Sequence, residues 1–138
     1  MLMGLGLDLV EIARIEHAWR RFGLKFAERI LHPLELAQLR QTIGEHPSPV
    51  PGGMRSAPLR NFLASRFAAK EAAVKALGTG FSSGIGFKDM YVKNLPSGRP
   101  ELFFLNAALD RMRELGASEV LLSLTHSRDT AAAVVILA

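Results

Sequence analysis

Four charged side chains, Arg66, Lys70, Glu71 and Lys75, lie in a stretch that otherwise has the character of a buried helix. Residues 61–78 are rich in Ala with Leu, contain no internal Gly or Pro, and end at a glycine placed to cap a helix. At about 100° per residue, Arg66 and Lys70 share one arc with apolar residues, namely Leu63, Val74 and Leu77. Buried charges must be paired or must hold a charged ligand, so this helix is a candidate site.

Two interpretations of these charges stay open from the helix alone. The side of the helix opposite that arc carries small residues that could pack closely on another element, namely Ala64, Ser65, Ala68, Ala69, Ala72 and Ala76. That pattern favours an interior helix with functional charges. The alternative is an ordinary solvated face on which Glu71 and Lys75, four residues apart, form a surface ion pair.

A second carboxylate stands in an unusual place near the start of the chain. Residues 3–10 alternate leucines with Gly4, Gly6 and Asp8, which predicts a strand with its leucines on one face and Asp8 on the other, where glycines leave room beside it. Aspartate is disfavoured inside strands unless it serves a purpose. It could join Glu71 in a site, or it could simply cap the following helix.

The next segment predicts an amphipathic helix with one strongly basic face. Residues 11–22 place a buried stripe at helical spacing, consisting of Ile12, Ile15, Trp19 and Phe22. The polar side and the residues that follow it carry Arg14, His17, Arg20, Arg21, Lys25 and Arg29. Basic faces are most often only solvated surface. With a net charge of +4 and a pI near 10, however, an anionic partner is a reasonable hypothesis.

The remaining pattern indicates an α+β fold in a single domain spanning residues 1–138. Further helices are predicted at 24–31, at 33–44 with apolar positions Leu34, Leu36, Leu39 and Ile43, and at 105–115. Residues 45–58 are dense in Pro, Gly and Ser and predict a loop. Strands at 87–95 and 101–104, and at 119–125 and 130–137, form two hairpins. Together they predict a mostly antiparallel sheet packed around the long central helix.

Two further segments could contact phosphate but are weak signals by themselves. The glycine- and serine-rich residues 78–87 could wrap a phosphate or form a flexible turn, and they do not match the Walker pattern. His126 stands at a predicted hairpin tip close to Arg128. It is either a turn residue or a phosphate contact.

Composition narrows the class of protein. The 138 residues contain no cysteine, which excludes a disulfide framework and a thiolate metal site. No apolar run reaches membrane-spanning length and no secretory leader is recognisable, so a cytoplasmic protein without membrane attachment is expected. A nucleic-acid-binding module is a rival suggested by the charge. The aromatic content of 7% and the lack of a binding motif weigh against nucleic acid as a partner.

Two separated segments, taken together, resemble the signature motifs of the 4′-phosphopantetheinyl transferases. The first is Gly6-Leu7-Asp8 followed by Arg14, and the second is RFAAKEA at residues 66–72 followed by KALG at residues 75–78. Residues 26–31 and 123–127 are also similar to the small bacterial members of that family. The similarity extends over essentially the whole chain. It adds a specific family to the α+β prediction.

The resemblance implies an enzyme that transfers the 4′-phosphopantetheine arm of coenzyme A to a serine of an acyl carrier protein, as in fatty-acid biosynthesis, and releases adenosine 3′,5′-bisphosphate. It implies Asp8 and Glu71 as Mg²⁺ ligands, with Lys75 neutralising charge on the departing nucleotide. The serine proton would pass to Glu71 or to a water on the metal. The third acid that larger two-domain relatives place at the metal has no match in this sequence.

The same resemblance assigns the substrate-binding residues and the assembly. Arg66 and His126 would approach the 3′-phosphate of coenzyme A, while Gly78 and Gly80 would let the backbone come close to the nucleotide. The acidic carrier protein would meet a basic surface formed by Arg14, Arg20, Arg21 and Lys25. Small family members form homotrimers with the site shared between subunits. A different metal-dependent enzyme acting on a nucleotide diphosphate is the remaining rival.

Overall fold

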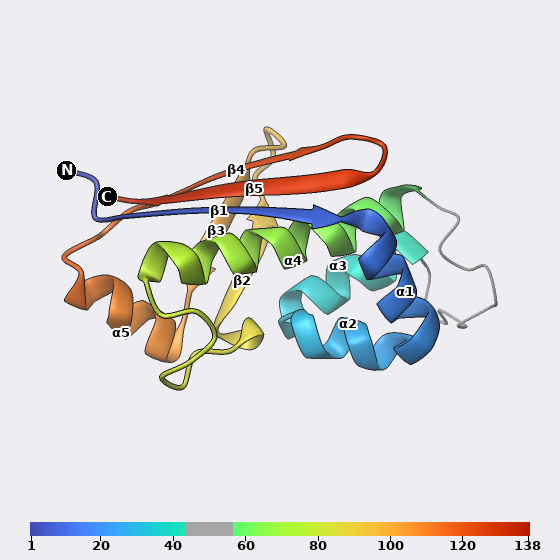
Figure 1. Ribbon diagram of the computed structural model, residues 1–138, viewed down its shortest axis with the longest axis horizontal. Coiled ribbons are helices and arrows are strands. Elements are labelled where there is room, and N and C mark those ends of the chain that lie inside the picture. Colours follow the sequence, from blue (N-terminus) through green and yellow to red (C-terminus); the bar gives the residue numbers. More distant parts are fainter. Residues whose placement is uncertain (44–56) are drawn as a thin grey trace.

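The long helix α4 (Ala57–Leu77) is the element on which the others pack in the computed structural model, which describes residues 1–43 and 57–138 (Figure 1). Before it come β1 (Gly4–Glu11), α1 (Ile12–Phe22), α2 (Leu24–Ile30) and α3 (Pro33–Ile43). After it come η1 (Phe87–Asp89), β2 (Met90–Asn94), β3 (Pro100–Phe104), α5 (Asn106–Glu114), β4 (Val120–His126) and β5 (Thr130–Leu137).

The predicted α+β class with antiparallel pairing around a long helix is confirmed. The strands form two sheets, one with the order β1-β5-β4 and one made of β2 and β3, and every pairing is antiparallel. α4 runs along one face of the three-stranded sheet (Figure 1). None of the helices in the described ranges is long and apolar enough to cross a membrane.

Some predicted boundaries were wrong. α4 begins at Ala57 rather than Asn61, so the end of the predicted 45–58 loop belongs to the helix. The rest of that loop, residues 45–56, lies outside the described residues. The predicted strand at 87–95 begins only at Met90, because residues 87–89 form a 3-10 turn.

Two apolar residues of the predicted helices are exposed. Phe22 was expected in the buried stripe of α1, but it is 50% exposed because the chain turns away at Gly23 and leaves this last helical residue uncovered. Leu34 is 52% exposed. The position of α3 that faces the interior in its place belongs to Glu35, which is fully buried.

β1 lies unusually close to α4 because it has no side chains at the contact. A Cβ atom added to Gly6 would stand 1.8 Å from the Ala72 carbonyl oxygen, and one added to Gly4 would stand 2.2 Å from that of Ala76. Side chains alternate along a strand, so Asp8 follows the two glycines on the same, helix-facing side. The glycines therefore bring the Asp8 carboxylate to the flank of α4.

Lys70 and Glu35 form a fully buried ion pair that ties α4 to four other segments. The Lys70 ammonium donates to Glu35 Oε1 at 2.5 Å, to the Ile30 carbonyl at 2.7 Å and to the Phe87 carbonyl at 2.9 Å. These three acceptors satisfy its three protons. Glu35 also accepts from the backbone N–H groups of His32 and Val92. Lys70 is thus a structural charge rather than a solvated one.

We predict that Gly6→Ala destabilises the protein by about 2–3 kcal/mol, because the new methyl group must push β1 away from the α4 backbone. Chemical denaturation should show this as a lower midpoint. Gly86→Ala is the matched control, because a Cβ there would meet its nearest neighbour at 3.9 Å. Equal stability of the two variants would contradict the close contact between β1 and α4.

Candidate functional site

Asp8, Glu71 and Lys75 form a cluster where β1 crosses the flank of α4. Lys75 Nζ donates to Asp8 Oδ1 at 3.1 Å and to the Leu7 carbonyl at 3.0 Å. The predicted alternative of a Glu71–Lys75 surface pair is not what the structure shows, since Lys75 is bound to the strand. The alternative role of Asp8 as a helix cap is also wrong. No side chain caps α1, and Ile12 N–H donates to the Asp129 carbonyl.

The electrostatics of Glu71 reflect this crowding. Partial burial raises the pKa of Glu71 above its ordinary value, and the negative charge of Asp8 raises it further. The positive charges of Lys75 and Arg14 oppose the shift. Two neighbouring carboxylates repel each other when both are ionised, and a bound cation would offset that repulsion.

The donor chemistry of this pair fits a hard divalent cation. Carboxylate oxygens are the ligands that Mg²⁺ prefers, and Mg²⁺ commonly uses only one or two of them beside water and substrate phosphates. Within residues 1–43 and 57–138, no group of three or more His, Asp or Glu side chains is placed to hold a metal. Asp8 and Glu71 are therefore the candidate protein ligands, and the described part of the chain offers no third.

Arg66 and His126 lie together, but apart from the carboxylates. Both line a pocket of about 370 Å³ with residues of β2, β3 and the start of α4. Arg66 is only 5% exposed, its guanidinium lies 4.4 Å from the Phe62 ring, and it donates to Ser65 Oγ at 3.2 Å. Burial lowers its pKa, which nearby Glu35 partly offsets. Among the described protein atoms its buried Nε has no hydrogen-bond partner, and the guanidinium brings a positive charge to the pocket.

The two groups of predicted site residues occupy different flanks of α4. At about 100° per residue, Arg66 and Lys75 point about 180° apart around the helix. The sheet repeats this separation, because Asp8 is on β1 and His126 is on β4, with β5 between them. A single chain therefore does not gather all of the predicted residues around one small ligand.

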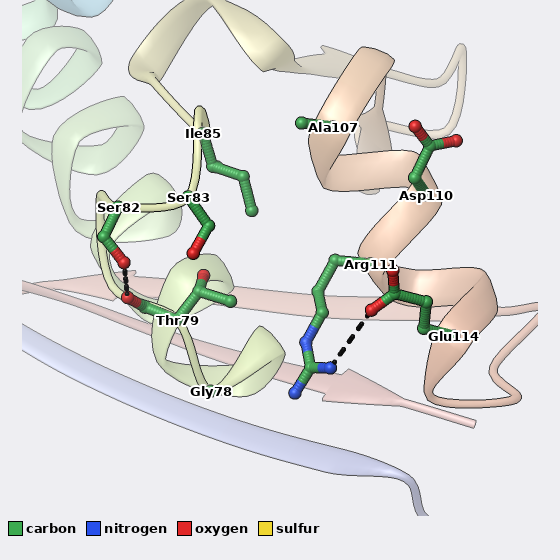
Figure 2. A pocket seen from close by; sticks show the side chains of 9 residues that line it. All are labelled: Gly78, Thr79, Ser82, Ser83, Ile85, Ala107, Asp110, Arg111 and Glu114. Atoms are coloured by element: carbon green, nitrogen blue, oxygen red, sulfur yellow. Dashed lines mark hydrogen bonds and ion pairs between the residues drawn. The ribbon is translucent and has the colours of Figure 1, made fainter.

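A glycine-rich turn follows the end of α4, shortly after Lys75, the lysine of the carboxylate cluster. Gly78 and Gly80 have φ of +74° and +60°, conformations that favour glycine. Gly78 and Thr79 line a pocket of about 620 Å³ between this turn and α5, together with Ser82, Ser83, Ile85, Ala107, Asp110, Arg111 and Glu114 (Figure 2). Phe81 anchors the turn by stacking on Phe87 at 4.0 Å between ring centres.

The basic face of α1 is exposed and borders an apolar groove. Arg14, Arg20, Arg21 and Lys25 are all exposed. Lys25 and Arg29 also line a groove of about 610 Å³ whose other residues are mainly apolar, namely Ala18, Phe22, Phe26, Ile30, Phe67 and Phe87. The exposed Phe22, which sequence analysis placed in the core, thus belongs to this surface.

Comparisons with known proteins agree with this architecture. The sequence profile of the 4′-phosphopantetheinyl transferase superfamily matches residues 4–135. The chain belongs to this family. The resemblance that the two motifs suggested is thereby confirmed, and with it the prediction that the protein is a transferase.

Individual relatives are similar along their full length. Holo-[acyl-carrier-protein] synthase of Nitratidesulfovibrio vulgaris is 51% identical over 137 residues, covering 99% of this chain and 98% of the relative. The crystal structure of the Neisseria meningitidis synthase has a TM-score of 0.82 at 36% identity, over 100% of this chain and 99% of that one. The Bacillus anthracis synthase, in complex with CoA (3′,5′-ADP), has a TM-score of 0.75 at 34% identity, over 99% and 96%.

Sequence reasoning missed two residues that support the site. Glu35 has the sequence signature of an ordinary acidic residue in a helix first turn, although a buried Lys70 requires some acidic partner. Arg111 is on α5 and donates from Nε to the Leu77 carbonyl at the end of α4. No pattern in the sequence indicates that long-range contact.

We predict that Glu71→Gln stabilises the metal-free protein near pH 7. Because the folded state raises the pKa of Glu71, the unfolded chain releases its proton more readily, so ionisation costs folding stability above the ordinary pKa of 4.5. The gain in melting temperature should shrink as the pH falls to about 4, where the carboxyl is protonated in both states. Glu28→Gln, on the exposed side of α2, is the control. A less stable Glu71→Gln at pH 7 would contradict the pKa direction.

Proposed function

We propose that the chain, acting as one catalytic domain, transfers the 4′-phosphopantetheine group of coenzyme A to a serine of an acidic apo acyl carrier protein and releases adenosine 3′,5′-bisphosphate. The observation that carries the proposal is the cluster of Asp8, Glu71 and Lys75, which unites the two family motifs at one place. The names of the full-length relatives support the same reaction. A chain without cysteines suits a cytoplasmic reaction.

Each residue of the cluster would have its own role in the reaction. Asp8 and Glu71 would hold Mg²⁺, which when bound offsets negative charge on the diphosphate that is being cleaved. Lys75 points its ammonium at the same place and would stabilise the charge that grows on the departing nucleotide. The nucleophile is the carrier serine, and its proton can pass to Glu71 or to a water at the site.

The remaining coenzyme A contacts come from two places. Gly78 and Gly80 leave the backbone open beside Lys75, so the nucleotide can approach it closely. Arg66 and His126, which line the same pocket, would take the 3′-phosphate there. Because this pocket lies on the other flank of α4, we propose that it serves the carboxylate cluster of a second subunit.

An uncovered apolar sheet face supports such an assembly, which we propose is a homotrimer. Leu5, Leu7 and Leu9 are 63%, 64% and 71% exposed, and they pair in register with Ile136, Val134 and Ala132 of β5. In the described part of the chain no helix covers this side of the sheet (Figure 1). A row of exposed leucines of this kind marks an interaction surface.

The carrier protein would dock on the basic face of α1. Arg14 lies close enough to Glu71 to lower its pKa, so this face leads directly to the carboxylate cluster. The apolar groove beside Lys25 and Arg29 offers a place for an apolar side chain of the carrier, with charges at its rim. Electrostatic attraction would then orient the serine toward Glu71.

The test of the proposal is the mass of an apo acyl carrier protein after incubation with this protein, coenzyme A and Mg²⁺. We expect a gain of one phosphopantetheine. The gain should disappear with EDTA, which removes the divalent cation, and with Glu71→Gln, which removes one of its carboxylate ligands. No gain with several carrier proteins would reject the function, and a gain that survives EDTA would reject the metal site alone.

Charge reversal should separate carrier binding from coenzyme A binding. We expect Arg20→Glu with Arg21→Glu to raise KM for the carrier on the order of tenfold and to leave KM for coenzyme A unchanged, because steering charges act on the protein partner. Arg14 is left intact because its charge reaches Glu71. Arg113→Glu, which reverses an exposed charge of α5 away from this face, is the control. Equal increases in both KM values would reject the docking surface.

Subunit mixing tests whether the site is shared. Asp8→Ala and Arg66→Met should each be inactive as homotrimers, and co-expressed mixed trimers should recover roughly one third of the activity, since one interface in three then pairs an intact cluster with an intact arginine. Thermal melting verifies that each variant is folded. Mixed trimers as inactive as their parents would show that each chain completes its own site.

A further inference from the structure

The end of α4 is held by a side chain from a distant part of the sequence. Arg111 Nε on α5 donates a hydrogen bond of 3.0 Å to the carbonyl of Leu77, the last residue of α4. The final carbonyls of a helix lack partners within it, and a cationic donor there also complements the negative end of the helix dipole. Arg111 therefore stabilises the point at which the chain leaves the helix.

Arg111 is also held in a fixed direction. Its Nη1 donates to Glu114 at 3.3 Å, one turn further along α5, and its Nη2 lies 3.8 Å from where a Cβ of Gly78 would stand. Figure 2 shows the side chain extending from α5 toward the turn at Gly78. The guanidinium thus bonds to the residue before Gly78 and lies beside Gly78 itself.

The glycine turn has further local bonds, and Arg111 is the tie that reaches it from α5. Backbone bonds join Gly78 to the Lys75 carbonyl and both Thr79 and Gly80 to the Val74 carbonyl, while Ser82 Oγ bonds to the Thr79 carbonyl. These contacts fix the turn internally. The Leu77–Gly78 peptide plane is held by two bonds, one from the Gly78 N–H to the Lys75 carbonyl and one from Arg111 to the Leu77 carbonyl, and the second comes from outside α4 and the turn.

We propose that Arg111 is a positioning residue for coenzyme A binding. By holding the Leu77 carbonyl it orients the backbone of Gly78, Thr79 and Gly80 for the nucleotide. The inference rests on the proposed function, because it assumes that this turn meets coenzyme A. It gives α5, which supplies no residue to the carboxylate cluster, a defined part in substrate binding.

Steady-state kinetics with each substrate varied separately test the proposal. We expect Arg111→Ala to raise KM for coenzyme A by about tenfold, the effect of losing one charge-assisted hydrogen bond. KM for the carrier protein should be unchanged. Arg111→Lys, which keeps a cationic donor, should recover most of the loss. Arg113→Ala, which removes an exposed arginine from the same helix, should have no effect on either KM.

Two measurements separate positioning from general loosening. Amide hydrogen exchange of residues 78–80 should become faster in Arg111→Ala, and this readout needs no substrate. Met112→Ala removes a buried side chain of α5 and so weakens its packing, while it leaves the Arg111 guanidinium and its bond to the Leu77 carbonyl in place. If it raises KM for coenzyme A as much as Arg111→Ala does, Arg111 acts only through the stability of α5 and the proposal is wrong.

The remaining outcomes are distinct. Faster exchange in Arg111→Ala with an unchanged KM for coenzyme A overturns the proposal and leaves the transferase function intact. Unchanged exchange overturns it as well. A wild-type protein that transfers no phosphopantetheine overturns the proposed function instead, while the exchange experiment still reports whether Arg111 orders the turn.

Discussion

The site depends on how closely β1 lies against α4. Two carboxylates of separate elements meet only if the backbone of the strand touches the backbone of the helix, and any side chain at positions 4 or 6 would prevent this. The alanines of α4 supply the other half of the contact, since Ala72 and Ala76 are buried beneath the strand. The glycine and alanine positions of the two motifs are therefore what allows the Asp8 and Glu71 side chains, the proposed metal ligands, to lie close together. This explains why small residues surround charged ones in both segments.

The buried Lys70–Glu35 pair has a different role. Removing two charges from water costs free energy that their attraction only partly returns, so an apolar pair of equal volume would give similar or greater stability. Burial lowers the pKa of Lys70 for this reason, although Glu35 opposes the shift. The pair instead specifies how the neighbouring segments are arranged, because the Lys70 ammonium needs all three of its acceptors in place around it. The pair joins the end of α2, the first turn of α3, the 3-10 turn and β2 to α4, the helix that carries Glu71. Lys70 and Glu71 are adjacent in sequence, yet Lys70 is buried in the interior whereas Glu71 lies beside Asp8 in the candidate site.

Local patterns were sufficient to predict most of the elements, the buried arc of α4 and the exposed face of α1. Alternation placed Asp8 on the glycine side of β1, and helical spacing placed Arg66 and Lys70 in the interior, because both periods are fixed by backbone geometry. The failures occur where a contact between distant segments decides the outcome. Phe22 follows the helical stripe but lies where the chain turns away, and Glu35 has the features of a surface acid until α4 covers it. Arg111 could not be predicted, since its partner is a backbone carbonyl that any residue at position 77 would offer.

A single helix that carries functional charges on opposite flanks poses a geometric problem for one chain. Lys75 reaches the carboxylate cluster on the β1 side, whereas Arg66 is buried on the β4 side beside His126. A ligand that meets both must reach two opposite flanks of the same helix. The same chain leaves a row of leucines exposed on the sheet and, among its described atoms, an arginine Nε without a partner. The proposed assembly of identical subunits would address these features together: it would cover the leucines, and it would let one ligand meet the two flanks on different copies of α4.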